Sequence, residues 1–359
     1  MARKTLAYIV DPTLGHVARA FRIARQLRED PRLRVVFIAP DQRIYARRFL
    51  AEEFELHLVD MRGPNEIAPY DRLAPGLERA LAEVGPDLIV HDLCPLRYLS
   101  TTRLPDCPRV HVTNLFLTGP AGQDTFQRRW FAEIAGTLNA TRRDKGLPIV
   151  TDVGELYEAD RVLCADPEFV AEALPPLPGH YRLLGDITLE LDLPVPDELR
   201  AAEDLMILSM GSTGADRFAP GLLAEIRAFS GSGRVIYVGR PVPGLDELEL
   251  LQGRYEWLPL HRILDRARIV VTQGGTGATY QALRHGRPVA VLPEHRNHEI
   301  LGAIVQNRGA GMVCGDGRAA AIGTDDFARM QRQAIAVGAQ MRRRPDGAAQ
   351  AAREILDLV

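Results

Sequence analysis

Short apolar runs alternate with segments of helical periodicity along most of the 359-residue chain. The first run, TLAYIV, is followed by HVARAFRIARQLRED, in which apolar residues recur at helical spacing. Strands that are apolar throughout, and that are separated by helices, indicate a parallel sheet covered on both faces. Several such strands precede residue 190, and a second series begins at Leu205. We therefore predict an α/β protein built from two doubly wound, Rossmann-like domains that face a central cleft.

An acidic, proline-rich stretch, GDITLELDLPVPDELRAAED, interrupts this alternation, and its weak periodicity is typical of a linker. We predict an N-terminal domain over residues 1–190, a linker over 191–204 and a C-terminal domain over 205–342. The last helix, over 343–359, is expected to pack back on the N-terminal domain. Ligands of open α/β sheets bind beyond the carboxyl ends of the strands, which is where we expect the functional residues.

The composition argues against several classes of protein. The net charge is -3 and the isoelectric point is about 6.3, so no overall basic field favours a nucleic-acid partner. The four cysteines are widely spaced without a CxxC pair, which indicates buried thiols in a reducing compartment. No run of 18 apolar residues predicts a transmembrane segment, and the start of the chain resembles a first strand more than a signal peptide. We expect a cytoplasmic protein whose oligomeric state is open, with a homodimer as one option.

Two glycine-rich turns follow predicted strands of the C-terminal domain. One is LSMGSTG, from Leu208, and the other is GGTGAT, from Gly274. Glycine lets the backbone approach a ligand closely, and the N–H groups at a helix N-terminus can bind phosphate oxygens. Neither turn fits the GxGxxG or GxxxxGK[ST] pattern. Each alone is also typical of an ordinary tight turn, but two at the same end of one sheet favour a phosphate-bearing ligand.

The order of motifs resembles that of the GT-B glycosyltransferases, specifically the family of bacterial natural-product glycosyltransferases and UDP-glucuronosyltransferases. GHVARAFRIARQL resembles the Gly-His turn and first helix of that family, and LSMGS resembles its Ser-x-Gly-Ser phosphate loop. YEWLPLHRIL, VTQGGTGATYQALRHGRPVAVLP and NRGAGMVC resemble its Trp-x-Pro-Gln segment, its donor signature and the Gly-x-Gly turn that follows. The resemblance covers nearly the whole chain. It implies an enzyme that binds its acceptor in the N-terminal domain and a nucleotide sugar in the C-terminal domain.

The implied donor site contains residues from both glycine-rich turns and from later segments. These are Ser209, Gly211, Ser212, Arg240, Trp257, Gln273, Gly274, Gly275, Thr276, Gly277, Gln281, Asn297 and His298. Trp257 and Arg240 are candidates to flank the nucleobase, although a tryptophan at a strand end is as often a core residue.

Several positions of the donor signature depart from the family pattern. Gln273 stands where the family usually has a phosphate-binding histidine, and Gln281 replaces the glutamate that commonly holds the ribose hydroxyls. Asn297 and His298 stand where an Asp-Gln pair often contacts the sugar. A glutamine amide can still donate to a phosphate oxygen or accept from a ribose hydroxyl. Because of these departures, the resemblance does not predict which nucleotide and which sugar the donor contains.

His16 is the candidate general base, because a histidine titrates near neutrality and its turn would face the acceptor. Asp92 resembles the supporting aspartate of the family, whereas Asp11 is an alternative by its proximity in sequence. His91 would point to the opposite side of the same strand. The chain contains no Asp-x-Asp pair. The resemblance therefore implies a metal-independent, inverting transfer in which the nucleotide sugar is a co-substrate and no cofactor is needed.

The sequence predicts the acceptor site less well than the donor site. Gly15, Phe116 and Trp130 are its candidate residues, although the segment around Trp130 also fits an ordinary amphipathic helix. The leading hypothesis is a glycosyltransferase of small molecules in natural-product biosynthesis. Its alternatives are a membrane-surface glycosyltransferase of cell-envelope or glycolipid precursors, a catalytically inactive GT-B partner protein, and a sugar-nucleotide epimerase, which would need carboxylates at the anomeric centre.

Overall fold

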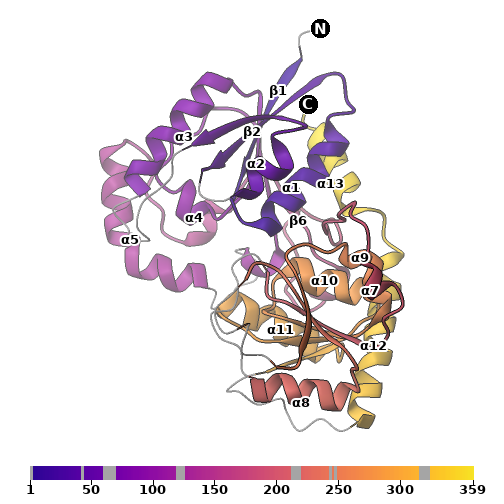
Figure 1. The fold of residues 1–359 in the computed structure, drawn as a ribbon. Coiled ribbons are helices and arrows are strands. Elements are labelled where there is room, and N and C mark those ends of the chain that lie inside the picture. The colour runs from indigo at the N-terminus through magenta and orange to yellow at the C-terminus, as the bar shows by residue number, and fades with distance from the viewer. Residues whose placement is uncertain are drawn as a thin grey trace. The chain divides into compact units, whose positions relative to one another are not determined.

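The computed structural model describes residues 3–41, 44–59, 70–118, 126–211, 220–241, 245, 249–314 and 324–359. The chain divides into two compact units (Figure 1). Unit 1 comprises Met1–Ile187 together with Pro345–Val359, and unit 2 comprises Thr188–Arg344. Each unit is an α/β domain around one parallel sheet, which confirms the predicted fold class.

Unit 1 is built on a seven-stranded sheet whose strands all pair in parallel. The strands are β1 (Lys4–Val10), β2 (Leu33–Pro40), β3 (Glu55–Val59), β4 (Leu88–Asp92), β5 (Arg109–Thr113), β6 (Arg161–Cys164) and β7 (Tyr181–Leu183). Their order across the sheet is β3-β2-β1-β4-β5-β6-β7, so the direction of winding reverses between β1 and β4. Val10 pairs with Asp92 in the register of these two strands. The carboxyl ends of β1 and β4 therefore lie side by side, at the point where such sheets bind ligands.

The helices of unit 1 follow the strands as the periodicity predicts. They are α1 (Leu14–Leu27), α2 (Ile44–Leu50), α3 (Tyr70–Val84), α4 (Pro95–Tyr98), α5 (Phe126–Asp144), α6 (Glu168–Ala171) and α13 (Gly347–Leu356), with 3₁₀ turns η1 (Leu115–Leu117) and η3 (Val153–Leu156). The buried face of α1 carries Val17, Ala20, Ile23, Ala24 and Leu27 at helical spacing, which is why this segment forms a helix against the sheet.

The last helix, α13, packs against α1, and both are drawn together in Figure 1. A Cβ atom at Gly347 would lie 2.9 Å from the carbonyl oxygen of Asp186, so only glycine permits this close approach. Asp346 caps α13 through the backbone N–H of Ala348 and also pairs with Arg22 of α1 at 3.2 Å. These contacts confirm that the C-terminal helix returns to the N-terminal domain.

Unit 2 is built on a six-stranded parallel sheet of order β10-β9-β8-β11-β12-β13. Its strands are β8 (Leu205–Ser209), β9 (Val235–Val238), β10 (Leu251–Tyr255), β11 (Ala267–Thr272), β12 (Val289–Val291) and β13 (Gly311–Val313). Its helices are α7 (Asp197–Arg200), α8 (Pro220–Ser230), α9 (Leu260–Ile263), α10 (Thr276–Arg284), α11 (Arg296–Asn307) and α12 (Thr324–Arg342), with the 3₁₀ turn η5 (Leu264–Arg266). Winding reverses between β8 and β11, where Ser209 pairs with Thr272.

The segment 191–204, which the sequence predicts to be a linker, belongs to unit 2 and contains α7. Arg262 donates to the carbonyl of Leu193 at 3.0 Å, and Tyr255 donates to Glu198 at 2.9 Å. A backbone carbonyl and an acidic side chain of this segment thus form hydrogen bonds within unit 2.

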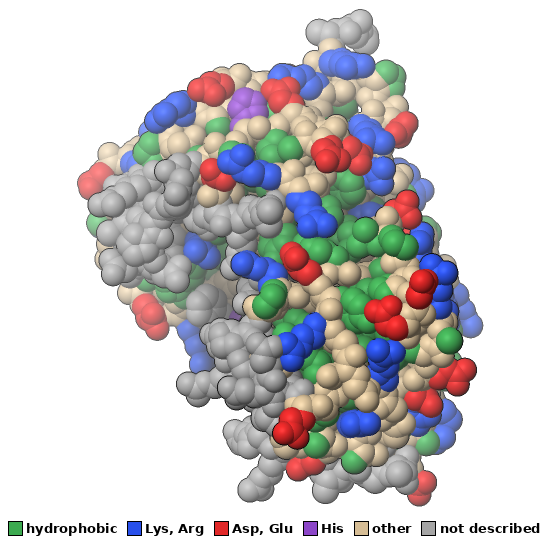
Figure 2. Space-filling model, in the orientation of Figure 1, with side chains coloured by type: hydrophobic (Ala, Val, Ile, Leu, Met, Phe, Trp, Pro, Cys, Tyr) green, Lys and Arg blue, Asp and Glu red, His purple; other side chains and the backbone are tan. Residues whose placement is uncertain are grey.

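Charged side chains of both signs are interspersed on the face drawn in Figure 2, in keeping with the small net charge. No helix in the described part of the chain is both long enough and apolar enough to cross a membrane.

Candidate active site

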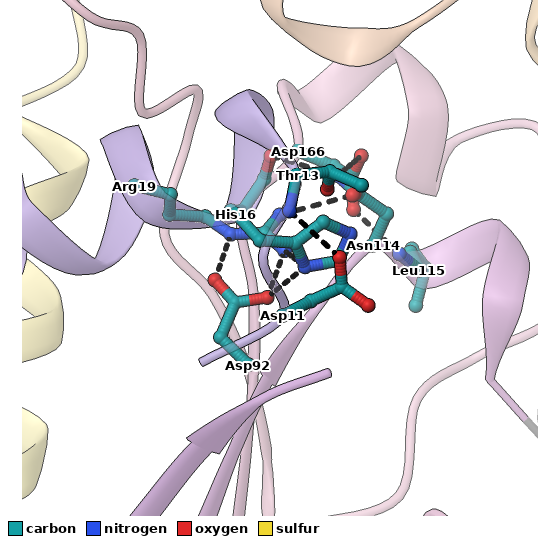
Figure 3. A network of polar contacts seen from close by, with 9 residues as sticks. Asp11, Thr13, His16, Arg19, Asp92, Asn114, Leu115 and Asp166 are labelled. Atoms are coloured by element: carbon teal, nitrogen blue, oxygen red, sulfur yellow. Dashed lines mark hydrogen bonds and ion pairs between the residues drawn. The ribbon is translucent and has the colours of Figure 1, made fainter. Parts of the chain in front are cut away.

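The candidate site in unit 1 lies where β1 and β4 end. The turn after β1 is held to β4, because the backbone N–H of Asp11 donates to the carbonyl of Asp92 at 2.9 Å. The carboxylate of Asp11 accepts the N–H of Thr13 at 2.9 Å, and α1 begins one residue later. This turn places His16 over the end of β4, where its Nδ1 lies 2.5 Å from Oδ1 of Asp92 (Figure 3). The carboxylate that pairs with His16 is thus Asp92, and the alternative, Asp11, shapes the turn.

A buried arginine also binds the carboxylate of Asp92. Arg19 lies three residues after His16 on the same helix and is only 5% exposed. Its Nε and Nη2 donate to the two oxygens of Asp92 at 2.7 and 2.6 Å, in a bidentate ion pair. Its Nη1 donates to Oδ1 of Asn114 at 2.9 Å, and Asn114 in turn donates to Asp166 at 2.9 Å (Figure 3). The network therefore joins α1 to the residues at or just beyond the ends of β4, β5 and β6.

Sequence reasoning missed Arg19, Asn114 and Asp166. The available signal was position, because Arg19 lies on the face of α1 that carries Val17, Ala20 and Ile23. An arginine on a buried face is rare unless it is paired. A carboxylate partner could therefore have been predicted for Arg19, although not its identity.

The pKa values of the pair follow from this burial and charge. Burial raises the pKa of Asp92, but the charges of Arg19 and His16 and their hydrogen bonds lower it more, so its pKa lies well below its usual range. Burial lowers the pKa of His16, but the charge and hydrogen bond of Asp92 outweigh this, and the pKa lies above its usual 6.5. Asp92 is therefore an ionised, acceptor-only group.

The ionised Asp92 fixes the tautomer of neutral His16. A carboxylate can only accept, so Nδ1 of His16 must carry the proton that it shares with Asp92. Nε2 is then the unprotonated nitrogen. It makes no hydrogen bond within the described part of the chain, and the side chain is 32% exposed. The arrangement presents an oriented imidazole that can accept a proton from a ligand hydroxyl.

The two glycine-rich turns of unit 2 also come together. Gly211 follows β8 with φ of 65°, and a Cβ atom there would lie 2.7 Å from Nε2 of Gln273, which follows β11. Gly274 has φ of 98°, and Gly275 is the N-cap of α10, where no side chain caps the first N–H groups. These N–H groups at a helix N-terminus can bind an anion. Ser212 lies outside the described residues.

Comparison with known proteins relates both units to one enzyme class. Residues 251–330 match the family model described as "Erythromycin biosynthesis protein CIII-like, C-terminal domain". The chain is 29% identical over 265 residues to the vancomycin aglycone glucosyltransferase of Amycolatopsis orientalis, a match that covers 67% of this chain and 63% of that protein. It is 24% identical over 374 residues to a PGL/p-HBAD biosynthesis glycosyltransferase of Mycobacterium tuberculosis, covering 92% of this chain and 84% of the relative.

Solved structures share the fold of this chain at lower identity. The glycotransferase of kitacinnamycin superposes with a TM-score of 0.72 at 18% identity, covering 99% of both chains. The spinosyn rhamnosyltransferase SpnG, solved in complex with thymidine diphosphate, superposes with a TM-score of 0.65 at 15% identity, covering 96% of this chain and 98% of that one. The chain has the GT-B fold. Its homologues are named glycosyltransferases, which confirms the resemblance that the motifs indicated.

The remaining donor candidates of this GT-B chain lie on three elements of unit 2. His298, on the first turn of α11, is 7% exposed, and burial lowers its pKa to about 3, so its ring is neutral. Its Nδ1 and Oδ1 of Asn297 are buried without a hydrogen-bond partner in the described part of the chain. The ring of His295 stacks on that of His298 at 3.6 Å. Two buried polar atoms near Gly274 are therefore unpaired among the described residues.

Gln281, by contrast, is tied to the protein. It lies on the buried face of α10, and its amide Nε2 donates to the carbonyl of Leu189 at 2.8 Å, so only its Oε1 is unpaired among the described residues. Trp257 is half-buried after β10, and Arg240 is exposed after β9, with its carbonyl accepting from Tyr237 at 2.7 Å. No group of three histidine, cysteine or acidic side chains in the described residues is arranged to hold a metal ion.

The structure places the aromatic acceptor candidates in packing contacts. Phe116, in η1, is only 4% exposed and offers a ligand little surface. Trp130, on α5, packs against the cluster that contains Leu96 and Ile134, as expected for an amphipathic helix. Gly15 is exposed beside His16, and a Cβ atom there would meet no other atom within 4 Å. Gly15 is thus the acceptor candidate with room for a ligand.

The space around two glycines of the donor signature gives a stability prediction. In Gly274→Ala, the new Cβ would meet Val291 at 2.9 Å and His298 at 3.0 Å, at a φ that only glycine adopts easily. We expect the free energy of unfolding to fall by about 1–3 kcal/mol, measured by urea denaturation. Gly277→Ala is the matched control, because nothing lies within 4 Å of its Cβ and the residue is helical. A Gly274→Ala protein as stable as the control would contradict this account of the turn.

Proposed function

We propose that this protein transfers a sugar from a nucleoside-diphosphate sugar to a hydroxyl group of a small-molecule acceptor, with inversion at the anomeric carbon. The observation that carries the proposal is the His16–Asp92 pair, in which a buried, ionised carboxylate holds the Nδ1–H of an accessible imidazole. The glycosyltransferase homologues and the GT-B fold support it.

The proposed reaction is a single displacement. Nε2 of His16 takes the proton of the acceptor hydroxyl while that oxygen bonds to the anomeric carbon. The bond from the anomeric carbon to the diphosphate oxygen breaks, and its electron pair leaves with the nucleoside diphosphate. Asp92 stabilises the imidazolium that forms, as buried carboxylates beside catalytic histidines do. One displacement on one face of the sugar inverts the anomeric configuration.

Donor binding is assigned to unit 2. The uncapped N–H groups of α10 and the amide of Gln273 would donate to the diphosphate and stabilise the charge that develops on it. Because neutral donors and the helix dipole supply this stabilisation, we propose that transfer needs no metal ion or cofactor. We further propose that the protein acts in the cytoplasm, a compartment that suits its four free cysteines.

The acceptor class is proposed from the relatives. One homologue is named for the vancomycin aglycone, and SpnG was also solved with spinosyn aglycone. We therefore propose a natural-product acceptor for this chain. An assay that pairs UDP-, dTDP- and GDP-sugars with a panel of phenols and macrolide aglycones, in the presence of EDTA, tests this directly. Mass spectrometry should detect a glycosylated product and the nucleoside diphosphate in equal amounts. Donor hydrolysis without sugar transfer would count against the proposal.

The proposed base predicts a pH dependence. His16 must be neutral to accept a proton, so kcat/KM should rise with pH through a pKa above 6.5. Asp92 and Asp11 raise this pKa, whereas burial and Arg19 lower it. In Asp92→Asn the main raising charge is lost, so the ascending limb should move to lower pH while kcat falls. The profile is measured from initial rates between pH 5 and 9, and an unmoved limb in Asp92→Asn would contradict the assignment of the base.

A further inference from the structure

A cavity lies in unit 1, on the other face of the sheet from the His16–Asp92 pair. Its volume is about 340 Å³, within the range of small-molecule sites. His91 lines it and directly precedes Asp92 on β4. Successive side chains of a strand point to opposite faces. The cavity is therefore separate from the candidate active site, although the same strand borders both.

One wall of the cavity is a buried guanidinium group without a bonded counter-ion. Arg142, near the end of α5, is only 9% exposed and lines the cavity. Its Nε donates to the carbonyl of Pro148 at 2.5 Å and its Nη1 to that of Ser100, and it forms no ion pair in the described part of the chain. Burying a charge without a partner is costly, so such a group favours an anionic ligand.

The other charged groups leave the cavity positive. Arg109, at the start of β5, is half-buried and its guanidinium makes no hydrogen bond or ion pair within the described residues. Glu155 is the acidic residue of the lining, and its carboxylate already accepts from the N–H and hydroxyl of Thr151 and from the N–H of Asp152. All three of these bonds go to Oε1 of Glu155. The lining thus carries two guanidinium groups and one carboxylate, with a net positive charge.

A neutral hydrogen-bonding group lies beside these charges. His91 is 1% exposed, and its Nδ1 has no partner in the described structure. Its ring stacks on that of His111 at 4.4 Å, while Nδ1 of His111 donates to the carbonyl of Tyr157 at 3.1 Å. Burial lowers the pKa of His91 well below its usual value, so the ring is a neutral imidazole that can donate one N–H.

The rest of the lining is apolar. It comprises Leu99, Leu104, Pro148, Ile149, Val150 and Leu156. Ile149 is 52% exposed, so part of this apolar lining is open to solvent. An inorganic anion would leave this surface wet, whereas an anion with an apolar body would cover it.

We propose that this cavity is a second ligand site, which binds a small organic carboxylate with an apolar body. Arg142 and Arg109 pair with the carboxylate, His91 donates a hydrogen bond, and the aliphatic lining covers the hydrocarbon part. Octanoate is a suitable probe, because it combines one carboxylate with a flexible apolar chain.

Isothermal titration calorimetry on the full chain tests the proposal. Octanoate should bind the wild-type protein, and octanol and inorganic phosphate should bind at least about tenfold more weakly, since each lacks one half of the ligand. Arg109→Gln should weaken octanoate binding about tenfold or more, since it removes a charge that holds no structural contact. Arg143→Gln is the matched control, because Arg143 is exposed next to Arg142 and does not line the cavity.

Three outcomes would overturn the proposal. Arg142 also holds the backbone of Pro148 and Ser100, so Arg142→Gln is informative only if it folds, whereas Arg109→Gln keeps the test decisive. Octanoate affinity that is equal in wild type and Arg109→Gln, or equal to that of octanol, would show that the guanidinium groups do not bind the ligand. Binding that is lost in His16→Ala would move the ligand to the candidate active site. We expect His16→Ala to bind octanoate normally.

Discussion

His16→Ala is expected to lower kcat for sugar transfer by about 10²–10⁴-fold, the usual contribution of a general base. Its imidazole is held through Nδ1 by Asp92 at 2.5 Å, and no other residue of the described structure pairs with that carboxylate except Arg19. Arg19 is a guanidinium group, which stays protonated and cannot take over as a base. The acceptor hydroxyl would therefore lose its proton only to water.

The loss should appear in kcat and leave nucleotide binding unchanged, because donor binding is assigned to unit 2. Steady-state rates and nucleotide titrations on the same preparation separate these two effects. His180→Ala is the matched control, because His180 has a similarly exposed side chain and also pairs with a carboxylate in unit 1, that of Glu158 at 2.6 Å, but lies outside the network. A His16→Ala enzyme that retains more than about a tenth of the wild-type kcat would mean that another group is the base.

Arg19→Met is expected to lower the free energy of unfolding by about 3–5 kcal/mol, the largest effect on stability that we predict. Arg19 is 5% exposed and Asp92 is fully buried, so removing the guanidinium leaves a buried carboxylate with His16 as its remaining charged partner. The bond to Asn114 is lost as well. Urea denaturation at pH 7.5 measures the change.

A double-mutant cycle isolates the ion pair from other effects of the substitution. Asp92→Asn in the Arg19→Met background removes the unpaired charge, so the double variant should be less destabilised than the sum of the two single variants. Arg25→Gln is the control on the same helix, because Arg25 pairs with Glu53 at 3.2 Å but its side chain is 49% exposed. Such a surface pair contributes at most about 1 kcal/mol. Additive single effects would show that Arg19 does not stabilise the fold through Asp92.

Much of the fold could be predicted from the sequence, because hydrophobic periodicity reports which faces are buried. The run from Leu6 to Val10 is apolar throughout and is a central strand with helices on both faces. The role of segment 191–204 could not be predicted in this way. Its prolines and acids are typical of a linker, but Glu198 and the carbonyl of Leu193 form hydrogen bonds to distant residues of unit 2.

The candidate active site could likewise be predicted only in part. His16 and Asp92 could be paired from sequence, because adjacent parallel strands bring their carboxyl ends together. The roles of Asn114 and Asp166 could not be predicted. Their hydrogen bond joins the residues that follow β5 and β6, and no periodicity in the sequence indicates such a contact. The burial of Phe116 could not be predicted either, because an aromatic residue in a loop suggests a ligand wall, whereas tertiary packing leaves this one only 4% exposed.

Nucleotide binding tests the central claim, that this GT-B chain uses a nucleoside-diphosphate sugar. We would titrate UDP, dTDP and GDP into the wild-type protein by calorimetry in the presence of EDTA, with Gly274→Ala as the variant whose donor turn is strained by contact with Val291 and His298. The account predicts that one of these nucleotides binds without metal and that Gly274→Ala binds it at least about tenfold more weakly. Binding of none of them would contradict the account and favour a catalytically inactive partner protein.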